Sequence, residues 1–234
     1  MATRPEELAP GIYRIDGIGL ANALNILAIG GDRGWTIVDT GISSSPKRIK
    51  TALAALGLRT TAVTSIYLTH HHTDHVGGLP RMRALAPQAE IIAPEYEAEI
   101  IAGRRPMDTS ANSTFRILQR LGRLRPVPVD RTVKEGDTIA GLRVIATPGH
   151  TLGHTSLLSD EHGLLLTADA FGVLPRKIRV GVRKVFCADP VLAKRSAEKL
   201  LSETYTTVVF SHGPVLRDNP RERLRQVVAD CNYA

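Results

Sequence analysis

The chain has 234 residues, of which 43% are hydrophobic and 23% charged, an ordinary composition for a globular protein. It excludes a collagen-like or intrinsically disordered chain. With 30 Lys and Arg against 23 Asp and Glu, the net charge is +7. That excess indicates either an arginine-rich soluble surface or an anionic partner such as nucleic acid, an acidic membrane or a small acid. Two cysteines cannot form a disulfide framework and suit a reducing compartment.

The N-terminal residues lack the apolar core of a signal peptide. The longest apolar runs have about six residues, far short of the roughly 20 that span a bilayer. We therefore expect a cytoplasmic protein without a membrane segment. Because no linker, repeat or low-complexity segment divides the chain, we expect a single domain over residues 1–234. The sequence leaves its oligomeric state open.

Short apolar runs alternate with helical patterns, which predicts a layered protein that mixes helices and sheet. In chain order, strands are expected at residues 12–15, 22–29, 35–39, 65–68, 142–146, 156–158, 164–167 and 207–210. Helices are expected from Pro46, with Ile49, Leu53 and Leu56 facing inward, around Leu79, Met82 and Leu85, and after Asp189-Pro190 and Asn219-Pro220. In the last two, a capping residue precedes a helix-starting proline.

Residues 103–131 are the least regular part of the chain. Within them, Phe115, Leu118, Leu121 and Leu124 recur every third residue and predict one helix with arginines on its other side. That helix either packs on the core or forms a lid over a site.

Polar side chains follow four of the expected strands at their C-terminal ends. One strand runs into His70, His71, His72, Asp74 and His75, and the other three run into His150, Asp169 and His212. Ligand sites gather at such strand ends because the sheet holds them rigid while the loops leave them open. Four imidazoles and a carboxylate within residues 70–75 have little structural use, so we interpret these strand ends together as a metal centre.

Neutral imidazoles and carboxylates suit divalent cations such as zinc. His70 and His72 are two residues apart, so in an extended segment they share a side and can chelate one ion. Asp74 and His75 lie beyond and can face a second ion, and Asp169 is an unassigned acid that can bridge the two. Two ions about 3.5–4 Å apart would hold a water as hydroxide near neutral pH and polarise a substrate oxygen.

Five motifs of the chain resemble those of the metallo-β-lactamase superfamily. They are Val38-Asp39-Thr40-Gly41, His70-x-His72-x-Asp74-His75, Thr147-Pro-Gly-His150-Thr-x-Gly-His154, Thr167-Ala-Asp169 and Ser211-His212-Gly, and they occur in family order. The resemblance covers about residues 12 to 215. It implies an α/β (α+β) fold, a four-layer αββα sandwich with a metal site at one edge of its two β-sheets.

The resemblance also implies the roles of the individual residues. The first metal would be bound by His70, His72 and His150, the second by Asp74, His75 and His212, and Asp169 would bridge them. Asp39 would orient one of the ligands.

Within the superfamily, Asp169 is similar to the bridging acid of glyoxalase II, of acyl-homoserine lactonases and of iron-dependent persulfide dioxygenases. Zinc β-lactamases with a cysteine ligand have that cysteine where this chain has Asp169. About 20 residues follow His212, too few for the glutathione-binding helical domain of glyoxalase II. Several lactonases have a tyrosine shortly after the bridging acid, where this chain has Phe171.

The resemblance implies a metal-dependent hydrolase that cleaves an ester, thioester or lactone bond of a small substrate through a metal-bridging hydroxide. Asp74 would be catalytic, as acceptor of the water's proton. The expected cofactors are two divalent ions, zinc first, with iron and manganese as alternatives.

Two other functions are weighed against this hydrolase. One is an oxidoreductase similar to persulfide dioxygenases, with a single iron on His70, His150 and Asp169. The other is a nuclease or nucleic-acid binder. Against the second stand the aromatic content of 4%, which leaves few stacking platforms, and the absence of the large extra domain of nucleic-acid-processing members.

Two segments carry the basic excess. Residues 101–131 hold seven Lys and Arg against two Asp, and residues 176–184 hold five and no acid. Their net charge is therefore +10, which leaves −3 for the other 194 residues. The second segment follows Asp169 closely, so we expect the substrate to be contacted by Phe171 and, through a carboxylate or phosphate, by Arg176, Lys177, Arg179 and Arg183.

Overall fold

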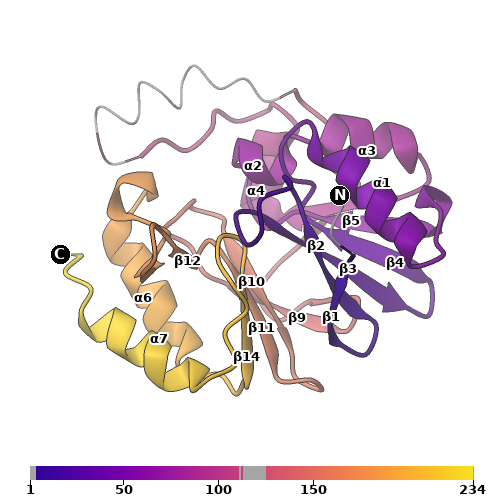
Figure 1. Cartoon of the computed structure of the whole chain (residues 1–234). Coiled ribbons are helices and arrows are strands. Elements are labelled where there is room, and N and C mark those ends of the chain that lie inside the picture. Colours follow the sequence, from indigo (N-terminus) through magenta and orange to yellow (C-terminus); the bar gives the residue numbers. More distant parts are fainter. Residues whose placement is uncertain (1–3, 111, 113–124, 234) are drawn as a thin grey trace. The chain divides into compact units, whose positions relative to one another are not determined.

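The computed structural model describes residues 4–110, 112 and 125–233 (Figure 1). The chain forms two compact units, one comprising Met1–Pro106, Leu124–Val133 and Ile139–Gly141, the other Met107–Arg123, Lys134–Thr138 and Leu142–Ala234. Each unit combines helices with a β-sheet, which confirms the predicted α/β class. The single domain over residues 1–234 stays a prediction.

The first unit is built on a seven-stranded sheet with the order β1-β2-β3-β4-β5-β6-β7. Neighbours are antiparallel from β1 to β4 and parallel from β4 to β7. The strands are β1 (Glu6–Ala9), β2 (Ile12–Asp16), β3 (Asn25–Gly31), β4 (Gly34–Val38), β5 (Val63–Tyr67), β6 (Glu90–Pro94) and β7 (Arg131–Val133).

Helices of the first unit cover this sheet. They are α1 (Ser45–Ala55), α2 (Thr73–Val76), α3 (Leu79–Leu85) and α4 (Glu95–Ile101), with a 3-10 turn at Thr60–Ala62. As expected, Pro46 stands in the first turn of α1, and Ile49 and Leu53 are buried. They share one hydrophobic cluster with Ile37 and Ile66, which pair across β4 and β5. This core holds the C-terminal end of β5 rigid.

The second unit contains a five-stranded sheet with the order β14-β11-β10-β9-β8 and a two-stranded sheet of β12 and β13. The strands are β8 (Thr138–Ile139), β9 (Leu142–Ala146), β10 (Thr155–Ser159), β11 (Leu164–Ala168), β12 (Phe171–Val173), β13 (Ile178–Val180) and β14 (Thr207–Phe210). Helices α6 (Pro190–Leu200) and α7 (Pro220–Ala229) lie side by side in this unit (Figure 1), and a 3-10 turn spans Lys184–Phe186. Leu165 and Val208, from the parallel pair β11 and β14, share a core with Ala197 and Leu224 of the two helices.

Within the described residues the expected elements are present, with two differences. The strand expected at residues 22–29 begins only at Asn25, because Asn22 lies in a turn with φ 63°. Asp189 caps α6 by accepting a hydrogen bond from the Leu192 N–H at 2.9 Å. Asn219 makes no such bond to α7; it adopts a left-handed conformation with φ 45°.

Several elements had no clear signal in the sequence: the described strands β1, β6, β7, β8, β12 and β13 and the helices α2 and α4. The helix expected around Phe115 to Leu124, and with it the middle of the suggested lid in residues 103–131, lies outside the described residues. No helix in the described part of the chain is long and apolar enough to cross a membrane.

Gly149 is a position where the fold tolerates no side chain. Its φ is +132°, and a Cβ there would lie 2.1 Å from the Ala193 nitrogen and 2.3 Å from its Cα. We expect Gly149→Ala to lower the free energy of unfolding by about 3 kcal/mol or more, since α6 must move. Equilibrium urea denaturation measures this loss.

Gly136→Ala is the matched control, because Gly136 also has a positive φ, of +85°, but no atom within 4 Å of the added Cβ. We expect it to cost about 1 kcal/mol. A loss at Gly149 no larger than the loss at Gly136 would contradict the steric argument.

Candidate metal centre

Four of the predicted ligands follow β5 in the first unit. The ring centroids of His70 and His72 are 4.9 Å apart, and those of His70 and His75 are 3.9 Å apart. His70 and His75 are buried, whereas His72 and Asp74 are half-buried. The structure therefore brings the three imidazoles of this motif together, with Asp74 in the first turn of α2.

Asp39, just after β4, positions this group through hydrogen bonds. Its Oδ2 lies 2.8 Å from Nδ1 of His75, and its carboxylate accepts hydrogen bonds from the N–H and the hydroxyl of Thr69, each at 2.9 Å. Thr40, the next residue of the same motif, donates both its N–H and its hydroxyl to the His75 carbonyl. Asp39 has a left-handed φ of 63°, a strained conformation that is typical of functional positions.

These contacts assign the protons of two rings. A carboxylate only accepts, so Nδ1 of His75 carries a proton and Nε2 presents its lone pair. The Thr69 hydroxyl donates its single proton to Asp39, so it accepts from Nδ1 of His70 at 3.0 Å. Both His70 and His75 thus offer Nε2 as the ligand atom, which is the tautomer that metal binding requires.

His71 has a different partner. Its Nδ1 lies 2.6 Å from Oε2 of Glu97, which also accepts the His71 backbone N–H at 2.8 Å. Both side chains are fully buried. Glu97, on α4, therefore anchors the backbone between His70 and His72. The sequence spacing did not indicate this pair. It only left His71 outside the predicted ligand set.

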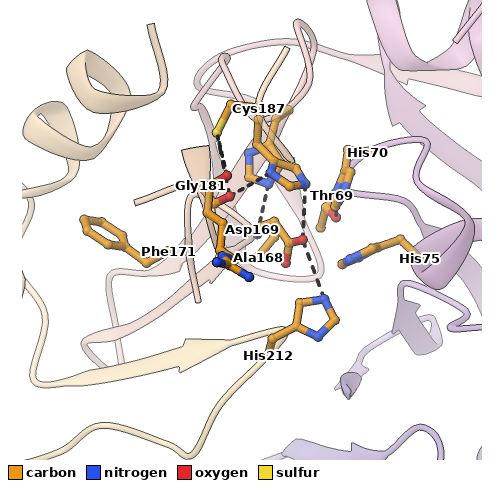
Figure 2. Close-up of polar contacts among 12 residues, drawn as sticks. Thr69, His70, His75, Ala168, Asp169, Phe171, Gly181, Cys187 and His212 are labelled. Atoms are coloured by element: carbon orange, nitrogen blue, oxygen red, sulfur yellow. Dashed lines mark hydrogen bonds and ion pairs between the residues drawn. The ribbon is translucent and has the colours of Figure 1, made fainter. Parts of the chain in front are cut away.

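The other three predicted ligands meet in the second unit. Nε2 of His150 lies 3.2 Å from Oδ2 of Asp169. Nε2 of His212 lies 3.6 Å from the same oxygen, and Figure 2 shows His212 facing Asp169. Nδ1 of His150 lies 3.2 Å from the Gly181 carbonyl, which only accepts, so the proton of a neutral His150 is on Nδ1. Its Nε2 and the carboxylate oxygen are then two acceptors that face each other.

Two facing acceptors require a cation between them, either a proton or a metal ion. Imidazole nitrogens and a carboxylate oxygen on three different loops are the donor set that zinc and related divalent ions prefer. The residues present, His150, Asp169 and His212, therefore fit a metal. His70 and His75 also fit one, because each carries its proton on Nδ1 and offers Nε2 as the ligand atom.

His154, which the sequence left outside the ligand set, positions Asp169. The Asp169 N–H donates to Nε2 of His154 at 3.0 Å, so His154 donates from Nδ1 to the Thr147 hydroxyl at 2.9 Å. Thr147 in turn donates to Ser156 at 3.0 Å, and Ser156 donates to the Thr167 carbonyl at 3.1 Å. All five residues are buried. This chain of hydrogen bonds fixes the backbone of Asp169.

Cys187 lies next to this group without being a donor to it. Its thiol is 3.7 Å from the Gly181 carbonyl and 3.5 Å from the Arg183 carbonyl. Burial, and secondarily the negative charge of Asp169, raises the pKa of Cys187 to about 12. The thiol is therefore protonated at neutral pH.

The predicted substrate contacts fall into separate surroundings. Phe171 has a relative exposure of 0% and packs in the core of the second unit, so the structure gives it a packing role. Arg176, Lys177 and Arg179 line one cavity, and Arg183 is not among the residues that line it. Contact of any of them with a substrate stays a prediction, as do the ligand roles and the catalytic role of Asp74.

We expect Asp39→Asn to lower the affinity for a divalent metal about 10- to 100-fold, because an amide does not fix the His75 and His70 tautomers. Metal content after dialysis against graded zinc concentrations measures this affinity. The control is Asp32→Asn, an exposed acid in the β3–β4 turn, which should bind like the parent chain. Equal metal binding by Asp39→Asn would contradict the role of this carboxylate.

For His154 we expect His154→Leu to weaken metal binding by a similar factor, because the Asp169 N–H loses its acceptor. His154→Gln should restore much of the affinity, since its side-chain oxygen can accept that bond. The same dialysis series measures both variants, and His162→Leu serves as a control outside the hydrogen-bond chain. Equal losses in the leucine and glutamine variants would show that His154 acts only through packing.

The chain matches the family model described as Metallo-beta-lactamase superfamily over residues 21–212. It is 29% identical to the uncharacterized protein YobT of Bacillus subtilis (strain 168) over 200 residues, 82% of this chain and 84% of that protein. It is 36% identical to a hydroxyacylglutathione hydrolase of Stenotrophomonas maltophilia (strain R551-3) over 111 residues, 47% of this chain. That match covers only 34% of the hydrolase.

Solved structures agree with the sequence match. A metallo-beta-lactamase family protein from Thermus thermophilus is 27% identical, with a TM-score of 0.72 over 95% of this chain and 80% of that chain. A metallo-beta-lactamase from Cronobacter sakazakii, a HARLDQ motif mutant, is 22% identical, with a TM-score of 0.72 over 97% of this chain and 94% of that chain, and shows the shared fold. The order of the motifs, the family model and these structures lead to one conclusion: the chain belongs to the metallo-beta-lactamase superfamily.

Proposed function

We propose that the chain is a metal-dependent hydrolase that cleaves an ester, thioester or lactone bond of a small-molecule substrate. The observation that carries the proposal is the approach of two imidazole nitrogens, from His150 and His212, to one oxygen of Asp169 while the Nδ1 proton of His150 is bound by Gly181. The similarity to a hydroxyacylglutathione hydrolase supports hydrolysis of an acyl compound. No nucleic acid or membrane is needed for this activity.

The proposed cofactors are two divalent ions, zinc first, with iron and manganese as alternatives, because all the donors are nitrogen or oxygen. By the resemblance of the motifs, one ion would be held by His70, His72 and His150, the other by Asp74, His75 and His212, with Asp169 shared. When bound, such ions supply a Lewis acid and lower the pKa of a water.

The chain's own residues would prepare and complete the reaction. Asp74, half-buried in the first turn of α2, would accept the proton of the attacking water. Asp39, Gly181 and His154 keep the ring nitrogens and the Asp169 backbone in place before substrate arrives. Groups fixed in this way do not have to reorganise during the reaction, which is the main source of electrostatic catalysis.

The experiment removes metal with a chelator and reloads the chain with zinc, iron or manganese. Each form is assayed on lactones, thioesters, simple esters and cephalosporins. We expect the stripped chain to be inactive and at least one metal form to hydrolyse an ester, thioester or lactone. His70→Ala together with His72→Ala should lose both metal and hydrolysis, whereas His162→Ala should keep both.

Three results would overturn the proposal. Full hydrolysis by the metal-free double variant would exclude the metal's role. Retention of iron, with oxygen uptake on glutathione persulfide and no hydrolysis, would identify an oxidoreductase. Salt-sensitive binding of RNA or DNA in a mobility-shift assay, without hydrolysis of the small substrates, would identify a nucleic-acid protein.

A further inference from the structure

A cavity of about 690 Å³ opens in the second unit, between the β12–β13 hairpin, the segment that follows β14, and α7 with the residues after it. Its volume lies within the range of roughly 300–1,000 Å³ that is typical of small-molecule sites. None of the proposed metal ligands is among the described residues that line it. The cavity is therefore a separate feature of this unit.

The charge around this cavity is strongly positive. Arg176, Lys177 and Arg179 reach it from the hairpin and Arg223 from α7, against a single carboxylate, Asp230, among the described lining residues. Asp230 already accepts a hydrogen bond from the Gln226 side chain at 2.8 Å, and the Nε of Arg179 donates to the Leu174 carbonyl at 2.8 Å.

The other three cations form no salt bridge with another described residue. In the described part of the chain, no carboxylate lies within salt-bridge distance of Arg176, Lys177 or Arg223. Elsewhere in the same unit, Arg143 and Arg225 pair with carboxylates. Clustered cations without counter-charges attract an anion, and a concave surface strengthens that attraction.

The walls between these cations are apolar. Val173, Ile178 and Val227 are partly buried against the core of the second unit, and Phe210 and Leu216 belong to that core. A simple inorganic ion would gain nothing from such walls, whereas an apolar body would be removed from water there. The cations and the apolar walls together favour a ligand that has both a negative charge and an apolar part.

We propose that this cavity binds an amphipathic anion, a small acid with a carboxylate or phosphate head and an apolar body. The head lies among Arg176, Lys177 and Arg223, and the body lies against Val173 and the other apolar wall residues. The Val173 N–H donates to the His212 carbonyl at 2.6 Å, so the ligand sits on a strand bonded to a proposed metal ligand. The proposal does not depend on the proposed hydrolase activity.

The first test is isothermal titration of the full chain with octanoate, octyl phosphate and the uncharged octanamide. We expect an anion to bind at least about tenfold more tightly than octanamide, and more weakly at higher salt concentration. Tighter binding of octanoate identifies a carboxylate ligand, and tighter binding of octyl phosphate identifies a phosphate ligand.

The variants localise this binding. Arg176→Gln combined with Arg223→Gln should weaken the preferred anion at least about tenfold, and Lys177→Gln alone should weaken it to a lesser degree. Arg195→Gln is the matched control, since Arg195 is an exposed cation on α6 that does not line the cavity. All four positions are exposed, so circular dichroism and the melting temperature should show intact folding.

A second test uses Cys231, which lines the cavity and is half-buried, while Cys187 is fully buried. Iodoacetamide should alkylate Cys231 in the free chain, and the anion should slow that alkylation by the fraction of sites it occupies. Peptide mass spectrometry measures both cysteines, with Cys187 as the internal reference.

Three results would contradict this anion site. The first is equal affinity for the anion in the parent chain and the arginine double variant. The second is equal affinity of the parent chain for the anion and for octanamide. The third is alkylation of Cys231 that is absent in the free chain or unaffected by saturating anion.

Discussion

A buried carboxylate that can only accept hydrogen bonds organises the first half of the proposed metal centre. Asp39 accepts hydrogen bonds from His75 and from the N–H and the hydroxyl of Thr69. Through Thr69 it also determines which nitrogen of His70 carries the proton. One acidic side chain therefore decides which nitrogen two imidazoles present. Asp39 itself has a left-handed backbone, which costs free energy. The sheet tolerates this conformation because the adjacent strand β4 is paired on both sides.

In the second unit, different groups determine which ring nitrogen of a histidine carries the proton. There a backbone carbonyl, that of Gly181, determines the proton of His150, and a chain of neutral hydrogen bonds through His154 and Thr147 fixes the backbone of Asp169. This chain of hydrogen bonds reaches the backbone N–H of Asp169, while the carboxylate of Asp169 faces His150 and His212. In both units, the proposed metal-ligand atoms present their lone pairs where water is largely excluded. A bound cation stabilises such an arrangement.

The sequence predicted the strands that carry these donors because their signal is local. The apolar runs at Leu142–Ala146 and Thr207–Phe210 match β9 and β14 to the residue. Short edge strands such as β1 lack such a run, since only part of their surface is buried. Asp189 caps its helix as expected. Asn219 adopts a left-handed conformation and makes no side-chain hydrogen bond to α7; its side-chain amide donates to Asp218 at 3.1 Å instead.

By itself, the sequence determined the family, the α/β class and the residue types of the proposed ligands, because motif spacing and strand ends are properties of neighbouring residues. Only the tertiary structure decided which distant residues form hydrogen bonds in the site: Glu97 with His71, and His154 with Asp169. It also placed Phe171 in a core and joined Arg223 to the basic hairpin around one cavity. These pairs are distant along the chain, and burial and proton assignment depend on neighbours that only folding brings together.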